Sequence, residues 1–156
     1  MAKLKSSLMA YFINIGTVAV PNWAPLGKGV TQIPVAYNPQ VTTETYVNED
    51  NATTSIDSFQ VSTGIDITKW DSVSAPAHAY LDNLRRIRAT GSAAECQILE
   101  VDLSTSGPYA ATLSNAVTAP DTLTVEGGKP QQLSQTIYLN GDPIQGTVTI
   151  TGGIPT

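Results

Sequence analysis

Residues 57–68 read DSFQVSTGIDIT, and apolar and polar side chains alternate along them. Phe59, Val61, Ile65 and Ile67 fall on one side of an extended chain, because successive side chains of a strand point to opposite faces. The polar set lies on the other side and comprises Ser58, Gln60, Ser62, Gly64, Asp66 and Thr68. This period of two predicts a strand with one face toward a core and one toward water.

The preceding segment supplies a partner for this strand. Residues 41–48 carry a weaker alternation and are rich in Thr, Tyr and Val, which suit a pleated surface. Residues 49–55 are too polar and too long for a two-residue hairpin turn. We expect them to form an exposed, mobile loop that joins two antiparallel strands.

One amphipathic helix is predicted over residues 74–90. Ser74 is a suitable N-cap, and Pro76 fits the first turn, where its missing N–H leaves no hydrogen bond unmade. Apolar residues then recur at three- and four-residue spacing: Ala77, Tyr80, Leu81, Leu84 and Ile87. Gly91 is expected to supply a left-handed cap.

A cationic cluster, Arg85, Arg86 and Arg88, crowds the last turn of this helix. It could contact phosphates. Complementarity with the negative end of the helix dipole and salt bridges to another subunit are favoured, because the whole chain is acidic.

The remainder of the chain reads as sheet. Strands are expected at 8–20, 30–37, 93–103, 121–126, 131–139 and 144–150. Pro34 confines its strand to an edge or a bulge. Gly127-Gly128 and Asn140-Gly141-Asp142 are expected to form turns between the last three strands, and residues 104–120 read as a long surface connection. The predicted fold class is mainly β (α+β), an antiparallel β-sandwich or barrel with one flanking α-helix.

Length and charge narrow the possible functions. The chain of 156 residues fits a single domain spanning 1–156. With 13 acidic and 8 basic residues it lacks the basic surface of a protein that grips duplex DNA. Only 13% of residues are charged, against about 25% in typical soluble domains. Such a surface suits either extensive subunit contacts or a Thr-rich β-domain that needs no partner.

Few residues suit catalysis or metal binding. His78 is the single histidine, and we interpret it as structural. Cys96 lies in an apolar strand pattern and is interpreted as a small buried hydrophobe. Glu49 and Asp50 are expected to be a solvated loop tip, since the spacing of a calcium loop is absent. The sequence therefore predicts no enzyme, no metal and no cofactor.

Membrane association and export are not expected. Lys3 and Lys5 precede an apolar run that imitates a signal peptide, but Asn14 and Gly16 interrupt it. No stretch reaches the roughly 18 apolar residues of a membrane helix.

The order of local motifs resembles the major tail tube proteins of long-tailed (siphovirus-like) bacteriophages. The similarity spans nearly the whole chain and rests on order and local character, with no invariant catalytic motif. The motifs are Trp23 with Gly27-Lys28-Gly29, Tyr37-Asn38-Pro39-Gln40, Thr45-Tyr46-Val47, the strand from Phe59 to Thr68, Leu81-Asp82-Asn83-Leu84-Arg85-Arg86, and residues 140–147, NGDPIQGT.

The resemblance implies a structural virion protein. Six subunits would form a ring, rings would stack into a tail tube assembled in the host cytoplasm, and viral DNA would pass through without sequence-specific binding. Further partners would be the tape-measure protein and tail-tip or terminator proteins. The lumen would be lined by Glu44, Ser58, Gln60, Ser62, Asp66 and Thr68.

The resemblance also implies which segments contact other subunits. The loop 49–55, with Glu49, Asp50, Asn51, Thr53 and Thr54, would touch the next ring. Residues 1–10 would form an arm that orders on assembly. Two alternatives are a tube subunit of a contractile injection or secretion apparatus and a monomeric Ig-like adhesion or carbohydrate-binding module.

Overall fold

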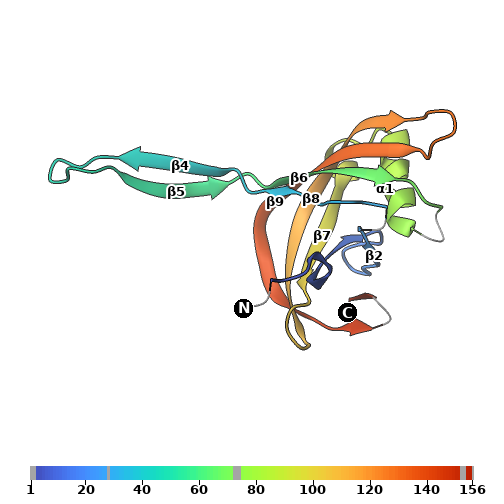
Figure 1. The fold of residues 1–156 in the computed structure, drawn as a ribbon, viewed down its shortest axis with the longest axis horizontal. Helices are drawn as coiled ribbons and strands as arrows, with labels where there is room; N and C mark the ends of the chain where they lie inside the picture. Colours follow the sequence, from blue (N-terminus) through green and yellow to red (C-terminus); the bar gives the residue numbers. More distant parts are fainter. Residues whose placement is uncertain (1–2, 28, 72–74, 152–153, 156) are drawn as a thin grey trace.

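The computed structural model describes residues 3–27, 29–71, 75–151 and 154–155. It has two parts, a body built on one large sheet and a long two-stranded arm that projects from it (Figure 1). The chain enters the arm after the short strand β3 (Val35–Ala36) and returns from it into β6 (Ser62–Thr68).

The body is organised on a seven-stranded sheet with the order β2-β1-β7-β8-β9-β6-β3, and every neighbouring pair in it is antiparallel. The other strands of this sheet are β1 (Met9–Asn14), β2 (Trp23–Pro25), β7 (Glu95–Asp102), β8 (Tyr109–Thr124) and β9 (Gln132–Val148). Outside it lie the helix α1 (Pro76–Arg86), the 3-10 turns Ser6–Leu8 and Gly91–Ala94, and the pair β10 (Ile150–Thr151) and β11 (Ile154–Pro155). The predicted class, mainly β with one flanking helix, is confirmed.

The core lies on both faces of the central strands. Ile13 of β1 packs with Ile65, Leu81 and Ile137 in a cluster that joins α1 to the sheet. Its neighbour Phe12 points the other way, into a second cluster that includes Leu99, Val101 and Ala111. The middle of the sheet is therefore covered on two sides, as in a sandwich.

The strand predicted over 57–68 is interrupted. Its second half is β6, where Ile65 and Ile67 are buried as expected. Its first half belongs to β5 (Thr53–Phe59), which ends before Gln60 and pairs only with β4 (Pro39–Glu44) in the arm. Phe59 is 56% exposed, so its predicted place in the core is wrong. The alternation continues through the break because both segments are extended.

Residues 104–120 are not a surface connection. Only the first few of them connect strands, and β8 begins at Tyr109. The prediction failed because the buried positions of β8 are filled by small side chains, including Ala111, Ala116 and Thr118. The segment therefore lacks the large apolar residues by which a buried strand is usually recognised. The predicted strand 121–126 is the end of β8.

The Asn140-Gly141-Asp142 segment does not form a hairpin turn. β9 runs through it without a break, and the pairing shifts from Leu113–Ile144 to Asn115–Asn140. Gly141 has φ 71°, so the left-handed residue that suggested a turn instead makes a bulge. The other predicted turn, at Gly127-Gly128, does join β8 to β9.

Helix α1 is shorter than the predicted 74–90. It begins after Ala75, and the predicted cap Ser74 lies outside the described residues. At its other end Arg88 N–H donates to Arg85 O and Ala89 N–H to Leu84 O, each at 3.1 Å. These two bonds are a Schellman cap, with Arg88 at the left-handed position (φ 49°) where glycine was expected three residues later.

The substitution Arg88→Gly should stabilise the protein, because glycine adopts a positive φ without the steric penalty of a Cβ. We expect the free energy of unfolding to rise by about 0.5–1 kcal/mol, measured by urea denaturation. The matched control Arg86→Gly, inside the last helical turn, should lower it by about 1 kcal/mol. A loss of stability in Arg88→Gly would contradict this account of the cap.

Candidate assembly surfaces

The arm consists of β4, β5 and a tip, residues 45–52. Its two strands pair with each other and with no other strand of the described structure. Val41 pairs with Ile56, Thr43 with Thr54 and Glu44 with Thr53, with a bulge after Gln40. The Thr43 and Thr54 hydroxyls hydrogen-bond at 3.1 Å, and Tyr46 OH donates to Glu44 Oε2 at 2.9 Å. Every residue of β4 and β5 is exposed.

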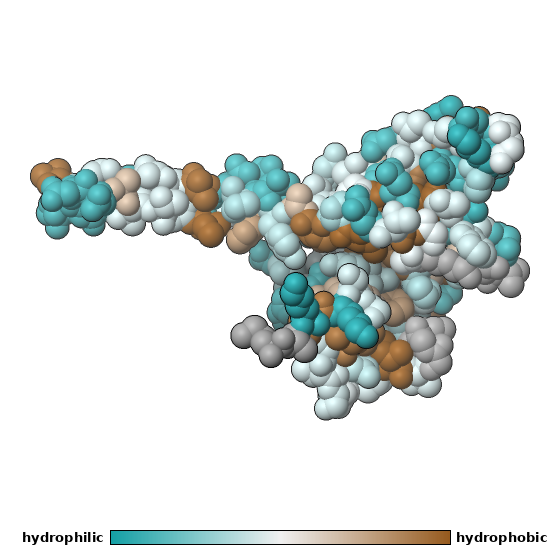
Figure 2. Space-filling view, viewed as in Figure 1, coloured by the Kyte–Doolittle hydropathy of each residue, from teal (hydrophilic) through white to brown (hydrophobic). Residues whose placement is uncertain are grey.

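Large apolar side chains lie on this exposed arm. Val41 and Ile56 are 55% and 59% exposed although they face each other across the two strands. Tyr46 and Val47 are exposed at the tip and Phe59 at the base. Figure 2 shows these apolar patches interrupting the hydrophilic surface of the arm. An isolated two-stranded hairpin is at best marginally stable in water, so such an arm is suited to a partner that covers it.

The residues predicted to contact the next ring all lie in the outer half of the arm. Glu49, Asp50 and Asn51 belong to the tip, and Glu49 Oε2 accepts a hydrogen bond from Thr53 Oγ1 at 2.9 Å. Thr53 and Thr54 are the first residues of β5. The sequence indicated an exposed loop here; the structure places that loop at the end of a projection.

The residues predicted to line a lumen do not form one surface. Glu44 and Ser58 are in the arm, and Gln60 lies at its base, where its backbone N–H donates to Tyr37 O. Ser62, Asp66 and Thr68 lie on the face of β6 opposite the core. Two different parts of the molecule therefore carry the predicted set.

The outward face of β6, β9 and β8 is acidic and rich in hydroxyls. Ser134 Oγ donates to Asp66 Oδ1 at 2.6 Å, and Thr136 Oγ1 donates to Asp121 Oδ2 at 3.0 Å. None of these three strands contains Lys or Arg. The face offers carboxylates and hydroxyls to whatever lies against it.

The cationic cluster divides into paired and unpaired members. Asp82 Oδ1 accepts from Arg85 Nη2 at 2.8 Å and from Lys69 Nζ at 3.2 Å, which ties α1 to the segment after β6. Burial alone would raise the pKa of Asp82, but the hydrogen bonds from Arg85 and Lys69 outweigh it and the pKa is lowered. Within the described residues, Arg86 and Arg88 take part in no ion pair.

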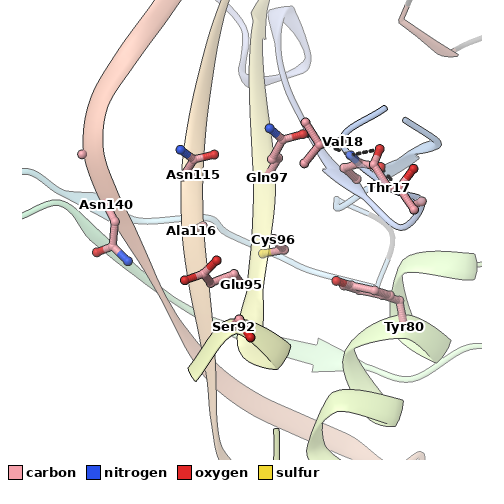
Figure 3. Close-up of a pocket in the computed structure, with 13 residues that line it drawn as sticks. Thr17, Val18, Tyr80, Ser92, Glu95, Cys96, Gln97, Asn115, Ala116 and Asn140 are labelled. Atoms are coloured by element: carbon pink, nitrogen blue, oxygen red, sulfur yellow. Dashed lines mark hydrogen bonds between the residues drawn. The ribbon is translucent and has the colours of Figure 1, made fainter. Parts of the chain in front are cut away.

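A hollow of about 530 Å³ lies where the loop after β1, strands β7 and β8, the β9 bulge and α1 meet (Figure 3). Gln97, Asn115 and Asn140 bring amides to it. Beneath it Asn14 is fully hydrogen-bonded: its amide donates to Thr17 O and Gln97 Oε1, and its Oδ1 accepts from two backbone N–H groups. Sequence patterns do not indicate this hollow, because its residues come from segments far apart in the chain.

The thiol and the phenol that line the hollow are not activated by their surroundings. Burial raises the pKa of the Cys96 thiol to about 12, so the thiolate is scarce at neutral pH. Burial also raises the pKa of Tyr80, which lines the same hollow. The interpretation of Cys96 as a buried hydrophobe is confirmed.

His78 is structural, as predicted. Its side chain is 1% exposed, and its Nδ1 accepts a hydrogen bond from the backbone N–H of Trp70 at 3.0 Å. Gly29 (φ 74°) approaches so closely that a Cβ there would lie 2.4 Å from Thr68 O and 2.9 Å from His78 Cε1. A residue without a Cβ is thus required at Gly29, where the backbone packs against Thr68 and His78.

The part of the chain that the structure describes contains neither a metal-binding cluster nor a membrane-spanning helix. No group of three or more His, Cys, Asp or Glu side chains there is placed to hold a metal ion. No helix there is long and apolar enough to cross a membrane.

Comparisons with known proteins give matches among solved structures. No protein-family model matches the chain, and no curated protein matches it. Among solved structures, it is similar to a chain in the cryo-electron microscopy structure of the anti-feeding prophage baseplate, at a TM-score of 0.49 and 12% identity, over 93% of this chain and 97% of that one. At this level of similarity, neither a shared fold nor a shared function follows.

The Asp82→Asn variant tests the ion-pair network at α1. Because the pKa of Asp82 is lowered in the folded state, its contribution to stability is present above the unfolded value of 3.8 and is lost as the pH falls through the folded value. The variant should unfold with about 0.5–1 kcal/mol less free energy at pH 7. Urea titrations should show this difference shrinking as the pH is lowered below 3.8, and a difference that does not shrink with falling pH would contradict the assignment.

Proposed function

We propose that the chain is a structural subunit of a tail tube of the long-tailed phage type, which assembles into hexameric rings that stack around a DNA conduit. The observation that carries the proposal is the arm, which projects from the body with Val41, Ile56 and Phe59 exposed (Figure 1). The order of sequence motifs, which resembles that of tail tube proteins, supports the choice of family. The exposed apolar arm provides a physical reason for subunits to assemble.

Stacking is the role that suits the arm. An arm that projects from one side of a subunit reaches the next subunit in the direction in which the arm points. Repeated head-to-tail contacts of this kind generate an open stack. Burying the exposed apolar side chains against a neighbour would stabilise the contact by about 25 cal/mol per Å² of apolar surface. The predicted inter-ring residues, Glu49 to Asn51, would meet the adjacent ring first.

Open sheet edges suit the closure of a ring. In the described structure β6 pairs with β9 only over residues 132–138, so β9 beyond Asn140 has no partner on that side. Beyond Val117, β8 likewise has no partner on the β7 side. Exposed edges of this length pair readily with another chain, and closure into a barrel removes the hazard.

The acidic outward face of β6, β8 and β9 suits a conduit for DNA. Asp66 would repel phosphates, whereas lysine or arginine there would bind them and retard the strand. In this assignment Ser62, Asp66 and Thr68 face the lumen, while Glu44 and Ser58, being in the arm, lie where rings meet.

The experiment is sedimentation and negative-stain electron microscopy of concentrated protein, alone and seeded with a phage tail tip. The wild type should form rings or hollow tubes. The Val41→Ser/Ile56→Ser variant should keep the same circular dichroism spectrum and remain monomeric, because the arm contributes nothing to the core of the body. The matched control Val125→Ser, at another exposed apolar position, should assemble normally.

A folded wild type that stays monomeric at high concentration with seeds present would remove the tube hypothesis. Assembly of the arm variant at the wild-type concentration would show that the apolar arm is not the stacking element.

A further inference from the structure

We propose that the acidic arm of one subunit docks into the groove at the C-terminal end of α1 in the next copy of this chain. This inference rests on the proposed function, which supplies the stacking of copies, and adds the receptor for the arm.

The groove lies between the end of α1 and the upper part of β8. Arg85, Arg88 and Thr90 line one side, residues 120–123 of β8 line the other, and its volume is about 430 Å³. Asp121 also lines it, with its carboxylate accepting from Thr136 Oγ1. Arg86 is exposed on the same helix end.

Unpaired positive charge lies at the groove, on Arg88 in its lining and on Arg86 at the same helix end. Among the described cations, Lys69, Arg85 and Lys129 take part in ion pairs, whereas Arg86 and Arg88 do not. The negative end of the helix dipole offsets about half a charge. The carboxylate of Asp121 offsets one charge more. The two unpaired guanidinium groups exceed both together and leave the helix end attractive to carboxylates.

The arm carries the complementary charge. Residues 39–59 contain Glu44, Glu49, Asp50 and Asp57 and no Lys or Arg, so the arm contributes −4 of the chain's formal net charge of −5. Glu49 and Asp50 lie at the tip, where they reach a neighbouring copy first. Two oppositely charged parts of one subunit attract each other within that subunit if they lie close together. If they lie far apart, each can bind only the matching part of another copy.

The two parts do lie on opposite ends of the molecule. Figure 1 places α1 at the end of the body remote from the arm. A copy translated along the arm therefore presents its α1 end to the tip of the previous copy, as head-to-tail stacking requires. Residues 39–48 extend to about 30 Å at 3.3 Å per residue, enough to reach past the edge of the next body.

Lys3 and Lys5 are the other described cations outside ion pairs. The dark blue start of the described chain lies on the side of the body from which the arm leaves (Figure 1), away from α1. They therefore do not belong to the docking site.

The test uses two charge-reversed variants of the full chain. Variant one is Arg86→Glu/Arg88→Glu, and variant two is Glu49→Lys/Asp50→Lys. Each alone should need about tenfold more protein than the wild type to assemble at low salt, because like charges then meet at every contact. An equal mixture should assemble within about threefold of the wild-type concentration, since alternating copies restore opposite charges at each contact.

Circular dichroism checks that all variants are folded. The mixture controls for net charge, because the changes of −4 in variant one and +4 in variant two cancel. Normal assembly of variants one and two separately, or a mixture no better than either alone, would overturn the docking site.

Failures of the two proposals are distinguishable. A wild type that forms tubes while both variants do so equally well retains the tube function and loses the docking site. A wild type that forms only charge-dependent chains, with rescue by the mixture, retains the docking site and loses the tube. Absence of any self-association in sedimentation velocity contradicts both.

Discussion

Apolar side chains need to be buried, and a two-stranded arm cannot bury its own; this requirement governs the rest of the structure. A pair of strands has two faces and no second layer, so Val41 and Ile56 stay more than half exposed even while they face each other. The body meets the same requirement internally, with Ile13 and Phe12 pointing into separate clusters on the two faces of the sheet. The contrast between a closed body and an open arm is the physical basis for proposing assembly.

The body was predictable where side chains of unlike character alternate. Ile65 and Ile67, the stripe of α1 around Leu81, and the turn at Gly127-Gly128 follow directly from periodicity and turn chemistry. β8 escaped prediction because alanine and threonine fill its buried positions. The β9 bulge escaped because a glycine with positive φ serves a bulge as well as a hairpin turn, and only the partner strand decides which one forms.

The candidate surfaces were predictable in composition but not in placement. The polarity of Glu49 to Asn51 indicated an exposed loop, whereas the break at Gln60, which converts half of a predicted core strand into an arm, leaves no mark on the alternation. Arg85 is paired with Asp82, whereas Arg86 and Arg88 are unpaired. Telling them apart requires the geometry of the helix and the position of Lys69 in the folded structure. A cluster of like charges in a sequence therefore does not reveal which members are available to a partner.

The most direct test of the central claim, that the arm needs a neighbour to stabilise it, is amide hydrogen exchange of residues 39–59 in the free subunit and in the assembled state. The account predicts exchange close to free-chain rates in the subunit and slowing on the order of 100-fold or more on assembly, with β6 and β9 protected in both. Strong protection of the arm in the free subunit, or no change on assembly, would contradict it.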